Sequence, residues 1–145
     1  MLMAVLILWA SELMNNKLNA SVTATISDKF AAGNDLVYLP DFKLSLNDLF
    51  KKKVYTLAEL AYCGQFDNAD LHYASTWAAK EAVYKAVKQL EPSALPFKKI
   101  EILRDKPGGR PYVVLHKYAG RFKISLTISH DGDYIWAIAL IEINL

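Results

Sequence analysis

The pattern of hydrophobic positions changes its period near Pro92 and Pro96. Upstream of these prolines, apolar residues recur every three or four positions, as on one face of a helix. Downstream, apolar and polar residues alternate, which is typical of half-buried strands. The alternation covers residues 99–103, 112–116, 124–129 and, in a more apolar form, 134–143. Helices followed by antiparallel strands predict an α+β fold, in which a central helix packs on an antiparallel sheet.

The central helix is predicted around residues 77–86, which read WAAKEAVYKA. Ser75 or Thr76 is expected to cap or open this helix, and Pro92 predicts that it ends near residues 90–91. One helix face is apolar and suits a core. It carries Ala79, Ala82, Val83, Ala86 and Leu90. The opposite face carries Trp77, Glu81, Tyr84 and Lys88, with Lys80 and Lys85 at its flanks.

Shorter elements are predicted on both sides of this helix. A strand covers residues 31–39 and includes one acidic residue, Asp35. Thr56 and Glu59 have the spacing of a capping box, which opens a helix that ends near Gly64. The last two strands form a hairpin about the Asp-Gly pair at residues 131–132.

Glu81 stands among cations and aromatic rings, and its local sequence leaves two interpretations open. In the first, Glu81 and Lys85 form an i,i+4 ion pair worth roughly a few tenths of a kcal/mol. In the second, Glu81 binds Mg²⁺ and adjacent lysines neutralise substrate phosphates, because this hard cation prefers carboxylate and phosphate oxygens. Asp35 leaves a similar choice between a turn residue beside Asn34 and a metal carboxylate.

The composition limits the classes of function. A chain of 145 residues with 53% hydrophobic residues has the length of one domain and can build one core. A net charge of +2 does not suggest bulk nucleic-acid binding, and the densest basic run is confined to residues 51–53. Cys63 is the single cysteine of the sequence, which excludes a disulfide framework and a zinc cluster and indicates a reducing, cytoplasmic setting.

The first 30 residues are interpreted separately from the rest. Residues 1–10 are almost wholly apolar, but this run is shorter than the about 20 residues that span a membrane. It also lacks the preceding basic region of a signal peptide. We therefore expect residues 1–30 to be an N-terminal extension or a first strand or helix, residues 31–145 to be the domain proper, and no membrane to be a partner.

Five short motifs occur in one order along the chain. They are GNDLV (33–37), YTLAE (55–59), WAAKEA (77–82) followed by Lys85, GRP (109–111) and TISH (127–130). Taken together, they resemble the motifs of the 4′-phosphopantetheinyl transferase superfamily, in its compact form that includes holo-acyl-carrier-protein synthase. Each motif alone is weak, whereas five in family order are fairly specific.

The resemblance implies transfer of the 4′-phosphopantetheine arm from coenzyme A to a serine of an acyl carrier protein or carrier domain, with release of adenosine 3′,5′-bisphosphate. It implies that Asp35 and Glu81 hold Mg²⁺, and that the base is Glu81 or a metal-bound water. Lys85 would contact phosphate and stabilise the leaving group, with Lys80 as a second candidate. The nucleotide end of coenzyme A would be lined by Gly109, Arg110, Pro111, Ser129 and His130. The pathway, fatty-acid or secondary-metabolite synthesis, is left open.

Two positions depart from the family pattern. Tyr38 stands where many members have a further acidic residue, and Thr76 stands where the small synthases often have arginine. These departures favour the runner-up hypothesis, a non-catalytic carrier-protein or coenzyme A binding module of the same fold. The compact group commonly forms trimers, so a homotrimer is a further expectation. Residues 51–53 are a candidate docking site for an acidic carrier protein.

Overall fold

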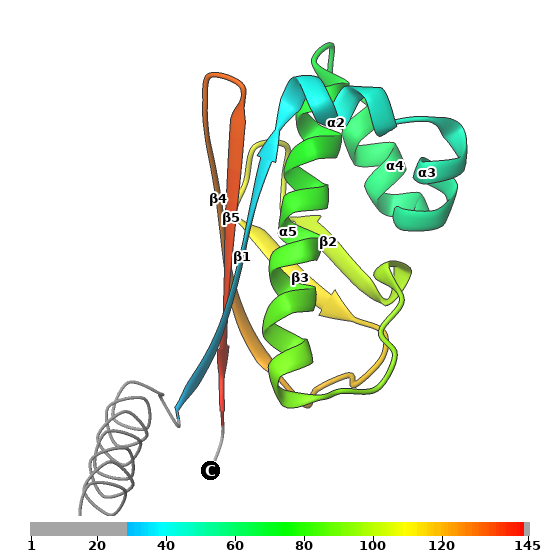
Figure 1. The fold of residues 1–145 in the computed structure, drawn as a ribbon. Coiled ribbons are helices and arrows are strands. Elements are labelled where there is room, and N and C mark those ends of the chain that lie inside the picture. Colours follow the sequence, from blue (N-terminus) through cyan, green and yellow to red (C-terminus); the bar gives the residue numbers. More distant parts are fainter. Residues whose placement is uncertain (1–28, 144–145) are drawn as a thin grey trace, which may run out of the picture.

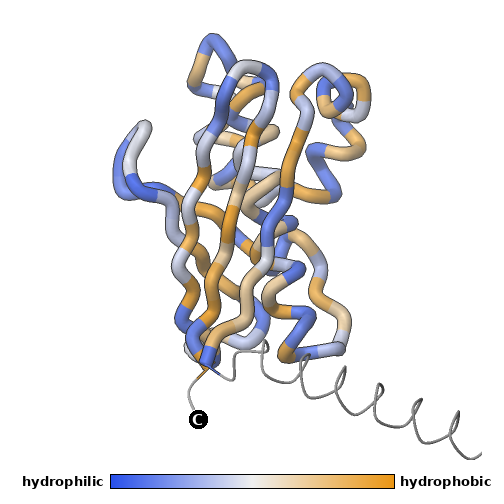
Figure 2. The backbone as a smooth tube through the Cα atoms, turned by 60° about the vertical axis from the view of Figure 1, so that its left-hand side comes forward, coloured by the Kyte–Doolittle hydropathy of each residue, from blue (hydrophilic) through white to orange (hydrophobic). Residues whose placement is uncertain are grey.

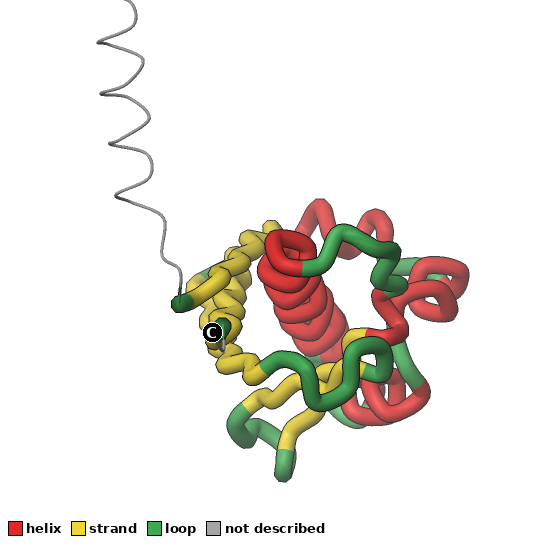
Figure 3. The backbone as a smooth tube through the Cα atoms, turned by 90° about the horizontal axis from the view of Figure 1, so that it is seen from below, coloured by secondary structure: helices red, strands yellow, loops and turns green. Residues whose placement is uncertain are grey.

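The computed structural model describes residues 29–143, so the predictions for residues 1–28 lie outside the described part of the chain. In chain order the elements are β1 (Phe30–Tyr38), α2 (Leu39–Ser45), α3 (Asp48–Val54), α4 (Leu57–Gly64), α5 (Ala69–Leu90), the 3-10 helix η1 (Phe97–Lys99), β2 (Ile100–Arg104), β3 (Pro111–Leu115), β4 (Lys123–Asp131) and β5 (Tyr134–Glu142). Helix α5 lies between a β1-β5-β4 sheet on one side and the short helices and the β2-β3 pair on the other (Figures 1 and 3). The predicted α+β fold is confirmed.

Both sheets are antiparallel throughout. The predicted hairpin is present: β4 and β5 pair up to Asp131 and Tyr134, and Gly132 in the connecting turn has a φ of 54°. Strand β1 pairs with the far side of β5 along its whole length, from Phe30 with Glu142 to Tyr38 with Tyr134. The first and last strands of the described chain therefore lie side by side.

The core lies between α5 and the three-stranded sheet. Of the apolar stripe predicted for the central helix, Ala79, Ala82, Val83 and Ala86 are buried, and Leu90 is partly buried. The helix-facing residues of β5 are also buried. Hydrophobic colour continues along most of β5, whereas β4 alternates (Figure 2). The outer face of the sheet is therefore also partly apolar. No helix within residues 29–143 combines the length and the apolar character that a membrane span requires.

The start of α5 differs from the prediction. The helix begins at Ala69, and Ser75 and Thr76 are buried inside it rather than capping it. Their hydroxyls find partners there: Ser75 Oγ donates to Leu71 O at 2.8 Å, and Thr76 Oγ1 lies 3.5 Å from Cys63 Sγ. A hydroxyl satisfied in this way does not need to end a helix. The predicted end at residues 90–91 is confirmed.

Gly33 brings β1 and α5 into direct backbone contact. A Cβ atom at this position would lie 2.0 Å from Ala82 O and 2.6 Å from Ala86 N. Only glycine permits this approach, because any side chain would overlap the helix backbone. Asp35 follows two residues later on the same strand, so the contact also fixes its height along α5.

We expect Gly33→Ala to destabilise the fold by at least about 1–3 kcal/mol, because the added methyl group must push β1 away from α5. Gly64→Ala is the matched control, since its Cβ would meet only Tyr73 Oη at 3.9 Å. The control should change the free energy of unfolding by less than about 0.5 kcal/mol. Chemical denaturation of both variants measures the difference, and equal effects would contradict the close-contact argument.

Candidate active site

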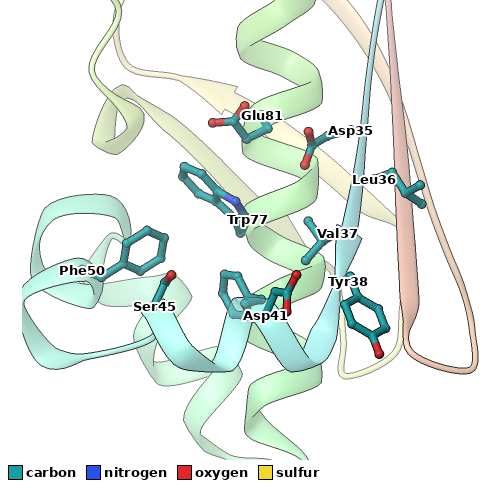
Figure 4. A pocket seen from close by; sticks show the side chains of 10 residues that line it. Asp35, Leu36, Val37, Tyr38, Asp41, Ser45, Phe50, Trp77 and Glu81 are labelled. Carbon is teal, nitrogen blue, oxygen red and sulfur yellow. The ribbon is translucent and has the colours of Figure 1, made fainter.

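An open groove of about 550 Å³ lies beside β1, α2 and α5. Figure 4 shows Asp35 and Glu81 at one end of this groove and Asp41 and Ser45 at the other. Trp77 lies between the two ends, and its ring packs on Phe50 at a centroid distance of 5.2 Å. The groove is thus acidic at both ends and aromatic in between.

Asp35 reaches the groove from the helix-facing side of β1. Along this strand, buried positions alternate with exposed ones, and Asp35 falls in register with Ala31, Gly33 and Val37. Its side chain keeps 15% of its surface exposed and pairs with Lys85, whose Nζ lies 2.7 Å from Asp35 Oδ1. Asp35 is therefore a strand carboxylate that faces α5, as the metal-carboxylate interpretation requires, and the turn interpretation is wrong.

Glu81 faces Asp35 from α5. Burial raises the pKa of the Glu81 carboxyl above its ordinary value, the negative charge of Asp35 adds to this rise, and Lys85 opposes it. The charge of Asp35 makes it more costly for Glu81 to ionise, and a cation between the two carboxylates would offset this repulsion. Lys85 pairs with Asp35 rather than with Glu81, so the structure does not form the i,i+4 pair of the first interpretation.

The oxygen donors fit Mg²⁺ in a site that the protein only partly encloses. Within residues 29–143 there is no group of three or more His, Cys, Asp or Glu side chains that could hold a metal. Asp35 and Glu81 would supply two carboxylates, and water and substrate phosphate would complete the octahedron. A third carboxylate is absent from the described part of this site because Tyr38 occupies the position where many family members have a further acidic residue. Tyr38 is at the groove, and its ring packs on Tyr134 at 5.1 Å between ring centroids.

Lys80 is not part of this groove. Its side chain is 0% exposed, and Nζ lies 2.8 and 2.7 Å from the two carboxylate oxygens of Glu59. The same ammonium also donates to Ile100 O. This corrects the prediction that Lys80 contacts substrate phosphates, because the side chain has no exposed surface and its three donors already have partners.

The residues predicted for the nucleotide end of coenzyme A lie elsewhere in the single chain. None of Gly109, Arg110, Pro111, Ser129 and His130 lines the Asp35–Glu81 groove. The first three belong to the β2–β3 connection and the start of β3, and the other two lie near the end of β4. One chain therefore brings together Asp35, Glu81 and Lys85, and leaves the two later motifs apart from them.

The two later motifs lie at a basic, aromatic end of the molecule that the sequence did not reveal. Tyr62 Oη accepts a hydrogen bond from Gly108 N at 3.3 Å, and the Arg104 guanidinium lies 4.5 Å from the Tyr62 ring centroid. The pKa of His72 is lowered, mainly by burial and further by the positive charges of Arg104 and His130. Only the tertiary fold joins these residues, so no local pattern predicts the cluster.

A pair of facing carboxylates with a lysine beside an open groove is the chemistry of a site for a metal and a phosphate. The family model for the 4′-phosphopantetheinyl transferase superfamily matches residues 31–139, and the chain belongs to this family. The family predicted from the five motifs is thus confirmed, and with it the enzyme class, a transferase.

Two curated relatives illustrate the range of proteins that carry this domain. The holo-[acyl-carrier-protein] synthase of Koribacter versatilis is 33% identical over 120 residues, which cover 76% of this chain and 95% of that protein. The fatty acid synthase subunit alpha of Candida parapsilosis is 32% identical over 142 residues, which cover 92% of this chain. The chain spans only 7% of the length of that subunit.

Solved structures agree with this assignment. The Chronobacterium ammoniagenes ACPS-CoA complex is 31% identical, with a TM-score of 0.68 and coverage of 81% of this chain and 100% of that chain. The holo-ACP-synthase from Plasmodium yoelii is 29% identical, with a TM-score of 0.64 and coverage of 79% and 95%.

Proposed function

We propose that this chain transfers 4′-phosphopantetheine from coenzyme A to a serine of an acyl carrier protein and releases adenosine 3′,5′-bisphosphate, with Mg²⁺ at Asp35 and Glu81. The observation that carries the proposal is the meeting of Asp35, Glu81 and Lys85 at one end of an open groove. The family membership of residues 31–139 supports the reaction class, and coenzyme A is the ligand named for the Chronobacterium ammoniagenes structure.

The chemistry assigns a role to each of these side chains. The serine oxygen attacks the phosphorus that carries the pantetheine arm, the phosphoanhydride bond breaks, and the bonding electrons leave with the nucleotide bisphosphate. Lys85 would donate to a phosphate oxygen as negative charge builds there. Glu81, whose pKa is raised, is the candidate in this chain to take the serine proton. A bound Mg²⁺ would neutralise charge on the pyrophosphate.

A homotrimer is part of the proposal because, within one chain, the residues expected to bind the nucleotide end of coenzyme A lie apart from the Asp35–Glu81 groove. Arg110 and His130 lie apart from the groove, and a neighbouring subunit is the simplest source of a second copy of them. The outer face of the β1-β5-β4 sheet supports such assembly, because Leu36 and Trp136 are opposite each other there and are 62% and 49% exposed. Exposed apolar patches of this kind mark interaction sites.

Helix α3 and its surroundings offer a docking surface for the carrier protein. Lys52 and Lys53 are exposed on α3, next to the groove-lining Phe50. Leu44 and Leu49 are also exposed on the neighbouring turns. A basic surface with exposed leucines complements an acidic partner that has its own apolar positions.

The setting that we propose is the cytoplasm. Cys63 is buried, and burial raises the pKa of its thiol to about 11, so the thiol is not disposed to react. A buried, unreactive cysteine is compatible with a reducing compartment.

The runner-up function is a non-catalytic carrier-protein or coenzyme A binding module. Tyr38 favours it, because it stands at the groove where many relatives have an acid, and its ring packs on Tyr134. Thr76 favours it too, because its side chain is buried against Cys63 and cannot supply a phosphate contact.

The reaction is tested by intact mass spectrometry of an apo acyl carrier protein after incubation with this chain, coenzyme A and Mg²⁺. We expect a gain of one phosphopantetheine that disappears with chelator, and a loss of at least about 100-fold in rate for Glu81→Gln. Glu142→Gln, on the exposed end of β5, is the control that should keep full activity. Bound coenzyme A without product across several carriers would support the runner-up, and full activity of Glu81→Gln would remove the metal assignment.

The docking surface is tested by charge reversal. Lys52→Glu/Lys53→Glu should raise the KM for the carrier roughly tenfold and reduce its salt dependence, because rim charges steer association. Lys52→Gln/Lys53→Gln should give an intermediate effect, and the KM for coenzyme A should stay the same in both variants. An unchanged carrier KM after charge reversal would refute this surface.

The trimer is tested by light scattering. Wild type should have three times the mass of one chain, and Trp136→Lys should dissociate it and lose transfer, because a buried lysine without a partner opposes assembly. Trp136→Phe should remain assembled and active. A fully active monomer would show that one chain completes its own site.

A further inference from the structure

The side chain of Lys85 makes two hydrogen bonds to adjacent residues of β1. Its Nζ lies 2.7 Å from Asp35 Oδ1 and 3.1 Å from Asn34 O, which is a backbone carbonyl of β1. One turn further along α5, Gln89 Nε2 makes a similar bond to Ala32 O at 2.6 Å. Two successive turns of the helix are thus tied to carbonyls of the same strand.

The two hydrogen bonds of Lys85 differ in how easily the ammonium can replace the acceptor with another one. The Lys85 side chain is 47% exposed, and an ammonium has three donors, so it can keep its bond to Asn34 O while another donor changes partner. An ion pair with one partly exposed partner is weaker than a fully buried one, because water screens the charge and can replace the bond. The Asp35–Lys85 pair is therefore the exchangeable contact of the site.

Resting on the proposed function, we propose that Lys85 changes partners during substrate binding: its ammonium leaves Asp35 for a phosphate oxygen of coenzyme A when Asp35 takes a divalent cation. Lys85 and the cation compete for the same carboxylate. Once the cation neutralises Asp35, the lysine is free to bind the phosphates, so metal and coenzyme A bind cooperatively. By linkage, each ligand then strengthens the other by the same factor.

The first measurement is the affinity for Mg²⁺ alone, by calorimetry, in the absence of coenzyme A and carrier. We expect Lys85→Met to bind Mg²⁺ about 3- to 10-fold more tightly than wild type, because a competing cation is removed from Asp35. Lys88→Met is the matched control. It removes a positive charge from the same helix, but Lys88 Nζ bonds Ser93 O at 2.9 Å, near the helix end, and the change should be less than about twofold.

The second measurement separates partner exchange from simple charge repulsion. The affinity for coenzyme A is measured with and without Mg²⁺, for wild type and Lys85→Met. Exchange predicts that Lys85→Met weakens coenzyme A binding mainly when Mg²⁺ is present, because without it the wild-type lysine stays on Asp35. Charge repulsion alone predicts the same loss in both conditions, and that result would overturn the proposal.

Further outcomes are equally decisive. Lys85→Arg keeps the charge and the donors, so it should fold and retain wild-type Mg²⁺ affinity, which guards against misreading a folding defect of Lys85→Met. If wild type binds Mg²⁺ and transfers the arm while Lys85→Met leaves metal affinity unchanged, only the exchange is wrong. If wild type binds no Mg²⁺ at all, the metal assignment in the proposed function fails, and the exchange fails with it.

Discussion

The buried ion pair between Lys80 and Glu59 organises the half of the molecule opposite the large sheet. Glu59 accepts from Lys80 Nζ through both oxygens, and also from Thr56 N and Ile102 N at 2.8 Å each. Lys80 completes the set by donating to Ile100 O. Burying two charges costs several kcal/mol per ion, and only a full set of hydrogen bonds offsets that cost.

This pair also acts as a substitute for a neighbouring strand. Strand β2 pairs with β3 on one edge, and its other edge presents Ile100 O and Ile102 N. Lys80 donates to the first of these groups and Glu59 accepts from the second, as a strand would do. The ion pair therefore joins α4, α5 and β2, and no buried side-chain nitrogen or oxygen within residues 29–143 is left without a partner.

The consequence for the site follows from the neighbouring position of Glu81. Successive residues of a helix are turned by about 100° from each other, so anchoring Lys80 in the interior also sets the direction of Glu81. On the opposite side of α5, the contact at Gly33 sets the distance to β1 and thereby to Asp35. Two packing constraints on one helix thus bring the two carboxylates to the same end of the groove.

Local patterns predicted the parts of this arrangement that depend on neighbouring residues. The spacing of Thr56 and Glu59 predicted the capping box, and both of its hydrogen bonds are present. The second use of Glu59 was not predictable, because its partners Lys80 and Ile102 lie 21 and 43 residues away. For the same reason, the adjacent Lys80 and Glu81 of the central motif suggested that both residues bind the substrate or its metal. The helix instead turns Lys80 into the interior and Glu81 toward the groove.

Lys80 and Lys85 show how one helix uses the same side chain for opposite purposes. Lys80 is saturated with buried partners, so any movement would leave charges unpaired in the interior, and it can only serve the fold. The half-exposed side chain of Lys85 meets one carboxylate and one backbone carbonyl at the rim, where water can replace each bond as it breaks. A site that must bind and release a highly charged substrate needs an exchangeable cation such as Lys85. The helix that carries this cation must itself be fixed, and the buried Lys80 helps to fix it.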